Sequence, residues 1–141
     1  MTFIHFNGLL HRDLKPANVM ITPSGEIKIL DFGLARVDNA DFVADNPDRI
    51  RGTPIYMAPE QAQGLGIDHR TDIFAAGLIV YELLMGEAAY RVPTRSADPL
   101  AEVMRAIEAG DLSEQCRSLE SRLPALGPVV TRALQRRVED R

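Results

Sequence analysis

The sequence predicts a mainly helical α+β fold in which one small β-hairpin precedes several helices. Residues 68–85 are apolar on nearly every side of a helix, begin with acidic side chains and stop at Gly86. A second helical pattern covers 99–109, and two short apolar runs flank Pro23-Ser24-Gly25. The 141 residues, 45% hydrophobic and 26% charged, are enough for one globular domain.

The first elements are a helix end and the hairpin. Phe3, Ile4 and Phe6 precede Asn7-Gly8, a pair that ends helices, so residues 1–6 are expected to form the last turns of a helix. The runs 19–22 and 26–30 are short, apolar and joined by turn residues. They predict two antiparallel strands joined by a tight turn.

Loops and further helices follow the hairpin. Residues 34–52 have no clean period and are rich in Asp, Asn and Pro, which predicts a long loop. The 68–85 helix is expected inside the core, and 91–98 is expected to connect it to the 99–109 helix, which stops at a glycine. Residues 123–138 predict another amphipathic helix, broken near its two prolines.

Composition excludes several partners and compartments. A net charge of -4 gives no electrostatic basis for binding nucleic acid, nor for a cationic membrane anchor. The longest apolar stretch, 73–85, contains Glu82 and is shorter than the ~20 residues that span a bilayer, so no membrane segment is expected in this chain. The single Cys116 forms no internal disulfide and is expected to have no redox role. No secretion signal is visible, so the expected location is cytoplasmic, although a full-length protein could be tethered to a membrane.

The chemistry-bearing residues flank the predicted hairpin in the sequence. His11-Arg12-Asp13-Leu14-Lys15-Pro16-Ala17-Asn18 precedes it, and Asp31-Phe32-Gly33 begins thirteen residues after Asn18. The hairpin therefore brings Asn18 and Asp31 together. A carboxylate, a lysine and two oxygen donors suited to magnesium are the groups that phosphoryl transfer onto a hydroxyl requires. Taken singly, a tripeptide such as Asp31-Phe32-Gly33 fits an ordinary polar turn equally well.

These motifs, with Ala58-Pro59-Glu60 following in the right order, resemble those of the eukaryotic-type serine/threonine protein kinases, especially the bacterial ones. The resemblance implies the mainly helical C-terminal lobe of the kinase fold. Only ten residues precede His11, and neither a Gly-rich phosphate loop nor a strand lysine is found there, so the N-terminal lobe is expected to be absent. On this basis 1–141 is a partial kinase domain, comprising a catalytic loop (11–18), an activation segment (31–60), a buried helix (68–85) and C-terminal helices (99–141).

The resemblance implies a role for each site residue. Asp13 is the expected catalytic base, and Lys15 neutralises charge on the transferred phosphoryl group of ATP. Thr53 is expected to bond to both, unless it is only a turn hydroxyl. Asn18 and Asp31 are the expected Mg2+ ligands. Met20 is expected to form the floor beneath the adenine ring, with Ile79 and Leu83 packed below it.

Other residues are implied to be structural. Glu60 is expected to form a buried ion pair with Arg141. Asp72 is expected to cap the buried helix and hold the backbone of the His11 turn, or else to be a plain acidic residue favoured by the helix dipole. His11 and Phe32 are expected to pack rather than react. The same holds for Tyr81 and Glu82.

The expected activation loop differs from the usual family pattern in its residue types. In the family, an arginine such as Arg12 usually pairs with a phosphorylated side chain of the activation loop. Residues 34–51 contain no Ser, Thr or Tyr, but they contain Asp38, Asp41, Asp45 and Asp48. One hypothesis is that a loop carboxylate replaces the phosphate; the alternative is that these acids only solvate the loop.

Two functions therefore remain open. The first is an ATP- and Mg2+-dependent serine/threonine protein kinase, of which this fragment carries the catalytic loop and is inactive alone. Its partners are ATP, a protein substrate bearing Ser or Thr, and a missing N-terminal lobe or partner kinase. The second is a pseudokinase-like binding module without catalytic activity, which docks partners through residues 52–56.

Overall fold

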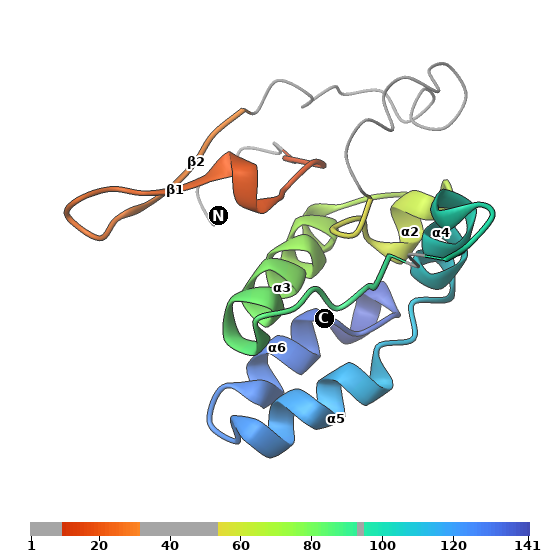
Figure 1. The fold of residues 1–141 in the computed structure, drawn as a ribbon. Coiled ribbons are helices and arrows are strands. Elements are labelled where there is room, and N and C mark those ends of the chain that lie inside the picture. The colour runs from red at the N-terminus through yellow and green to blue at the C-terminus, as the bar shows by residue number, and fades with distance from the viewer. Residues whose placement is uncertain (1–9, 32–53, 93–94) are drawn as a thin grey trace.

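The computed structural model describes residues 10–31, 54–92 and 95–141. The expected helix at 1–6, the 34–52 loop, Phe32 and Thr53 lie outside them. The described part has one two-stranded sheet followed by helices (Figure 1): η1 (Pro16–Asn18), β1 (Val19–Ile21), β2 (Ile27–Ile29), α2 (Pro59–Ala62), α3 (His69–Met85), α4 (Pro99–Ala109), α5 (Ser113–Arg122), α6 (Gly127–Ala133) and η4 (Val138–Asp140). The predicted mainly helical α+β fold is confirmed.

The hairpin is confirmed in the predicted place. Its strands are antiparallel, with Val19 opposite Ile29 and Ile21 opposite Ile27. The turn closes because the amide of Gly25 donates to the carbonyl of Thr22 at 2.9 Å. Gly25 has a φ of 84°, a left-handed conformation that glycine adopts without steric penalty.

Helix α3 forms the centre of the molecule, as predicted. Its first turn is capped by Asp68, whose side chain accepts a hydrogen bond from the amide of Arg70 at 2.7 Å. The expected cap, Asp72, lies in the first turn instead, so that part of the prediction is wrong. The helix ends at Gly86, which has a φ of 75°. One side of α3 is not covered by the described residues, since Leu83 is 78% exposed.

The C-terminal helices agree only in part with the prediction. Helix α4 begins after Asp98 and stops at Gly110, as predicted. The amphipathic helix expected over 123–138, broken near its two prolines, is found only in part. Helix α6 covers Gly127–Ala133 alone, and Pro128 lies in its first turn, where its missing N–H is no loss. Helix α5 was not predicted, because only Cys116 and Leu119 are buried along it and its other side chains give no apolar stripe.

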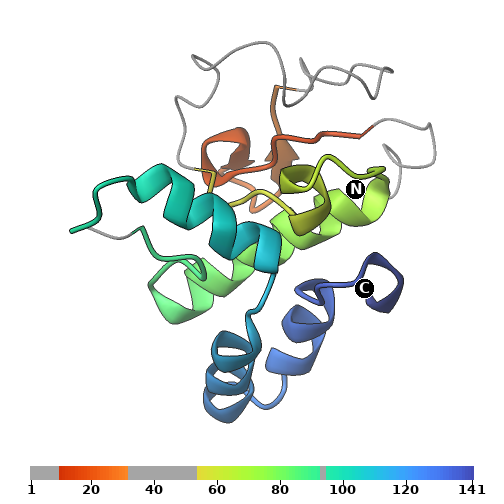
Figure 2. The same ribbon diagram turned by 90° about the vertical axis from the view of Figure 1, so that its right-hand side faces the viewer.

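The hydrophobic core lies between α3 and the helices that follow it (Figure 2). Its fully buried side chains include Phe74, Leu78, Ile107 and Leu119. A second, smaller cluster attaches the hairpin to α3: Leu14, Ala75 and Ile79, with Val19 and Ile29 packed against them. Helix α3 is thus the support on which both the helical core and the catalytic loop rest.

Within the described ranges, we find no helix long and apolar enough to cross a membrane.

Candidate active site

The catalytic loop is fixed by its backbone. The carboxylate of Asp72 on α3 accepts two hydrogen bonds, one from the amide of His11 and one from the amide of Arg12, both at 2.9 Å. On the other side, the side-chain amide of Gln61 on α2 donates to the carbonyl of Arg12 at 2.8 Å. Arg12 is thereby held at a φ of 65°, which is unfavourable for a non-glycine residue. The predicted contact of Asp72 with this turn is confirmed.

Asp13 and Lys15 form an ion pair at the surface of the loop. The Nζ of Lys15 lies 2.6 Å from Oδ2 of Asp13, and their side chains are 38% and 39% exposed. A carboxylate at this exposure can meet a substrate hydroxyl, and the ammonium group lies within reach of a phosphoryl group bound beside it.

Asn18 is positioned by both the loop and the hairpin. Its Nδ2 donates to the carbonyl of Asp13 at 2.9 Å, and its own carbonyl accepts from the amide of Leu30 at 2.8 Å. The carbonyl of Leu30 in turn lies 2.9 Å from Nε2 of the buried His11. Asp31 follows Leu30 directly and is exposed at a left-handed φ of 57°. The structure thus places Asn18 and Asp31 at the same end of the hairpin.

Magnesium fits this pair only together with a phosphate-bearing ligand. The bond from Nδ2 to Asp13 leaves Oδ1 of Asn18 as the atom that would bind a metal, and the carboxylate of Asp31 supplies hard oxygens. No cluster of three His, Cys, Asp or Glu side chains suited to a metal is found in 10–31, 54–92 or 95–141. Mg2+ is commonly held by one or two protein oxygens plus phosphates and water, so the residues fit a metal that arrives with a nucleotide.

The predicted packing beneath the adenine position is wrong in one respect. Ile79 is buried with Leu14 and Ala75. Leu83, expected beside it, is 78% exposed, and Met20 is 44% exposed. Leu83 lies four residues further along α3 than Ile79, beyond the part of the helix on which the hairpin is packed.

The segment that precedes α2 is tied to α3 by a hydrogen bond from the hydroxyl of Tyr56 to Oε2 of Glu82. The pKa of Tyr56 is raised to about 12, first because its hydroxyl is buried and second because it bonds to this carboxylate.

Thr53 lies outside the described residues, so its expected bond to Asp13 and Lys15 stays a prediction. Sequence reasoning missed Gln61, because a glutamine in a short helix carries no signal that it will be buried and bonded to a loop.

The predicted ion pair between Glu60 and Arg141 is confirmed. The guanidinium donates to Oε1 at 2.6 Å and to Oε2 at 2.9 Å, and the two side chains are 3% and 0% exposed. Thr71 donates a further bond to Oε1 of Glu60 at 2.8 Å. The guanidinium carbon of Arg141 lies 4.5 Å from the centre of the Phe74 ring. The C-terminal end of the chain is therefore locked onto α2 and α3.

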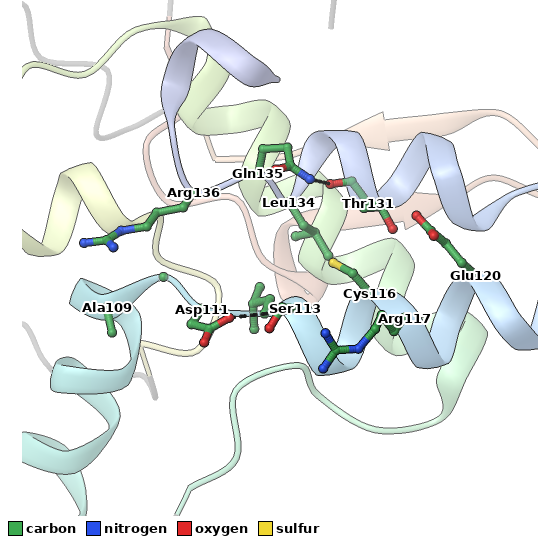
Figure 3. Close-up of a pocket in the computed structure, with 12 residues that line it drawn as sticks. Ala109, Asp111, Ser113, Cys116, Arg117, Glu120, Thr131, Leu134, Gln135 and Arg136 are labelled. Atoms are coloured by element: carbon green, nitrogen blue, oxygen red, sulfur yellow. Dashed lines mark hydrogen bonds between the residues drawn. The ribbon is translucent and has the colours of Figure 1, made fainter.

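A separate groove of about 480 Å³ lies between α5, α6 and the residues after α4 (Figure 3). Cys116 is one of the residues that line it, and burial raises the pKa of its thiol, which argues against reactivity. Gln135 and Arg136 line the same groove, and their carbonyls accept bonds from Arg141. The groove therefore adjoins the C-terminal anchor rather than the catalytic loop.

The family model for the protein kinase domain matches residues 1–141. This chain belongs to the protein kinase family. It is 34% identical over 142 residues to a probable serine/threonine-protein kinase of Clostridium acetobutylicum, a match that covers all of this chain and 20% of the relative. It is 35% identical over 143 residues to the serine/threonine-protein kinase PknB of Mycobacterium tuberculosis, again over all of this chain and 22% of the relative.

A third kinase relative is pkn3 of Myxococcus xanthus, which is 35% identical over 147 residues and matches 97% of this chain and 26% of its own length. The chain therefore spans about a fifth to a quarter of the length of these curated kinases. The similarity shows the serine/threonine kinase family for this chain and leaves the activity of the whole protein as a proposal.

Proposed function

We propose that this chain carries the catalytic loop and the magnesium-binding residues of an ATP-dependent serine/threonine protein kinase. In the complete domain, the enzyme transfers the γ-phosphate of ATP to a Ser or Thr hydroxyl of a protein. Asp13 accepts the proton of that hydroxyl, and Lys15 stabilises the transferred phosphoryl group. Asn18 and Asp31 hold Mg2+, which supplies positive charge to the phosphates. Met20 and Thr53 complete the nucleotide and substrate contacts.

One observation carries the proposal: the backbone of the loop is fixed on both sides of Asp13. Asp72 and Gln61 hold Arg12, and Asn18 holds the carbonyl of Asp13 itself. Phosphoryl transfer depends mainly on positioning and charge stabilisation. A loop fixed by three side chains meets the positioning requirement before any ligand binds.

The second candidate function is a kinase-like binding module. The 141 residues contain no G-x-G-x-x-G pattern of the kind that covers bound phosphates, and this candidate function needs none. Partners would dock on residues 52–56, beside the Tyr56–Glu82 hydrogen bond. This module would not need Asp13, Lys15, Asn18 and Asp31, whereas the kinase would.

Two variants separate these functions in the natural protein that contains this chain. Asp13→Asn should abolish phosphate transfer to a protein substrate while Mg2+-dependent ATP binding stays unchanged, because the base is lost and the metal ligands remain. Asp31→Asn should weaken Mg2+-dependent ATP binding itself. Glu26→Gln, at an exposed acid of the hairpin, is the matched control. Transfer that survives Asp13→Asn would overturn the assigned role of Asp13.

The 141 residues alone should not phosphorylate a generic basic protein and should bind ATP–Mg2+ weakly at best. If the 141-residue polypeptide phosphorylates a substrate, and this activity disappears in Asp13→Asn, the expectation that the 141 residues alone are inactive is wrong. An open reading frame upstream of Met1 that encodes a Gly-rich loop and a strand lysine would favour the kinase. A promoter and ribosome-binding site there would favour the binding module.

A further inference from the structure

Gln61 joins two backbone segments that are far apart in the sequence. Its side chain is only 6% exposed, and both polar atoms of its amide group are bonded. Nε2 donates to the carbonyl of Arg12 at 2.8 Å, while Oε1 accepts from the amide of Ala58 at 3.1 Å. Turning the amide over would place a donor against a donor and an acceptor against an acceptor, so these partners fix its orientation. One side chain therefore links the catalytic loop to the residues that precede α2.

The bond to Arg12 restrains the peptide group that leads into Asp13. Because a peptide unit is planar, a side chain that holds the carbonyl of Arg12 also orients the amide of Asp13. Asn18 holds the next carbonyl, that of Asp13 itself, at 2.9 Å. The Cα of Asp13 thus lies between two carbonyls that side chains restrain. Without Gln61, the first of these peptide groups would be free to rotate, and the direction of the Asp13 carboxylate would change with it.

The bond to Ala58 restrains the other segment. Ala58 is fully buried, directly precedes the first residue of α2 and has no side-chain acceptor that caps a helix. The amide of Met57 donates to the carbonyl of Pro54 at 2.8 Å, so residues 54–57 form a turn that leads directly into Ala58. This turn contains the described part of the segment 52–56, on which a protein partner is expected to dock.

No second hydrogen bond between described residues joins α2 to the catalytic loop. Tyr56 packs against the cluster that contains Leu14, but apolar contact is not directional. The hydrogen bonds of Gln61, in contrast, need a separation of about 2.7–3.2 Å on both sides of one amide group. They therefore set the distance between the two segments more narrowly than the apolar contact does.

We propose that Gln61 is a positioning residue, which sets the distance between the catalytic base Asp13 and the segment that receives the protein substrate. The proposal rests on the kinase function proposed above. In that reaction, the substrate hydroxyl oxygen forms a bond to the γ-phosphorus, the bond from this phosphorus to the departing ADP breaks, and Asp13 takes the hydroxyl proton. The substrate is docked on one segment, whereas the base lies on the other. A shift of about 1 Å between them can cost roughly a hundredfold in rate.

Two variants of Gln61 separate its two bonds. Gln61→Glu keeps an oxygen that accepts from the amide of Ala58, but a carboxylate cannot donate to the carbonyl of Arg12. Gln61→Met has a similar length and loses both bonds. Gln63→Glu is the matched control. Gln63 also donates from Nε2 to a backbone carbonyl, that of Glu108 at 2.6 Å, but it is exposed and ties the end of α2 to α4 instead of the loop.

The assay compares two reactions of the natural protein that contains this chain: phosphate transfer to a generic basic protein and hydrolysis of ATP by water. The ratio of these rates does not depend on the folded fraction, so a merely destabilising substitution leaves it unchanged. Water does not dock on the segment before α2 and adjusts to a shifted carboxylate, whereas a docked substrate does not. Both Gln61 variants should therefore lower the ratio of transfer to hydrolysis about tenfold or more, with an unchanged KM for ATP. Gln63→Glu should keep the ratio of the original protein.

Amide hydrogen exchange of residues 10–15 gives a second readout that needs no activity, and it should be faster in both Gln61 variants than in Gln63→Glu. An unchanged ratio in both Gln61 variants, or a loss confined to Gln61→Met, would overturn the proposal, because the bond to Arg12 would then not matter. Normal transfer by the original protein would in that case leave the kinase function intact. If the original protein transfers no phosphate, the proposed function is wrong, and the exchange measurement alone decides whether Gln61 holds the loop.

Discussion

Replacing Arg141 by alanine should destabilise the protein more than any other substitution of a single charge in the described part of the chain. The guanidinium uses all five of its N–H groups. Two bind the carboxylate of Glu60, and the others bind the carbonyls of Gln135, Arg70 and Arg136 at 2.7, 3.3 and 3.0 Å. Glu60, only 3% exposed, would be left without its cation. Breaking a buried pair by removing one partner costs about 3–5 kcal/mol.

That loss is a large share of the stability expected for a domain, which is about 5–15 kcal/mol in total. Urea unfolding followed by circular dichroism should therefore show a lower midpoint with an unchanged slope. Arg141→Lys should recover only part of the loss, because an ammonium group has three donors and cannot reproduce the planar fork. The double variant Glu60→Gln/Arg141→Met should lose less than the sum of its single variants, because neither buried charge remains.

Arg137→Ala is the matched control. Arg137 also pairs with a glutamate near the C-terminus, at 2.5 Å from Glu139, but the two side chains are 72% and 57% exposed. An exposed pair of this kind contributes little, so its removal should leave the urea midpoint within experimental error. If Arg141→Ala and Arg137→Ala change the midpoint equally, the reasoning from burial and from the five hydrogen bonds is wrong.

Three further outcomes are expected. Gly110→Ala should cost about 1–3 kcal/mol more than Gly86→Ala in urea unfolding, because both positions have positive φ but only the Cβ at 110 meets side-chain atoms at 2.9 Å; equal losses would refute this. Since the folded pKa of Tyr56 is raised to about 12, its contribution to stability should be complete below pH 10 and disappear as the pH rises through about 12. Glu82→Gln should shift the phenolate absorbance titration of Tyr56 to lower pH, and an unshifted curve would exclude the carboxylate as a cause. Asp72→Asn should cost about 1–3 kcal/mol and speed amide exchange in the loop, whereas unchanged exchange would show that the loop keeps its shape without this carboxylate.

Sequence patterns predicted the elements whose signals are local and strong. Helix α3 is apolar on most sides, and glycines end both α3 and α4, so these helices were predicted to their last residues. Helix α5 lacks such a signal, because its stability comes from contact of two buried side chains with neighbouring helices. Asp72 was assigned the wrong cap role for a related reason. Two acids near a helix start are both compatible with capping, and only the three-dimensional structure shows that Asp68 takes that role while Asp72 faces the loop.

For the site residues as well, local patterns predict some features, and the others depend on contacts between distant parts of the chain. The chemical types at 13, 15, 18 and 31 follow from the motifs, but their placement depends on long-range bonds that no local pattern encodes. Asn18 is held by the carbonyl of Asp13, and its own carbonyl is reached by the amide of Leu30 across the hairpin. Gln61 was missed because its role exists only once α2 lies beside the loop.

These long-range bonds link the C-terminus to the catalytic loop in two steps. Arg141 holds Glu60, and the next residue, Gln61, holds the carbonyl of Arg12. Helix α2 has four residues, too few to keep its position without such contacts. Its orientation therefore depends on the buried ion pair at one residue and on the loop at the next. Gln61 and Asp72 together keep Arg12 in an unfavourable backbone conformation. If the ion pair no longer fixes α2, the hydrogen bond from Gln61 is weakened, and Arg12 loses one of these two restraints. A C-terminal arginine far from Asp13 in sequence thus contributes to the geometry that the proposed phosphate transfer requires.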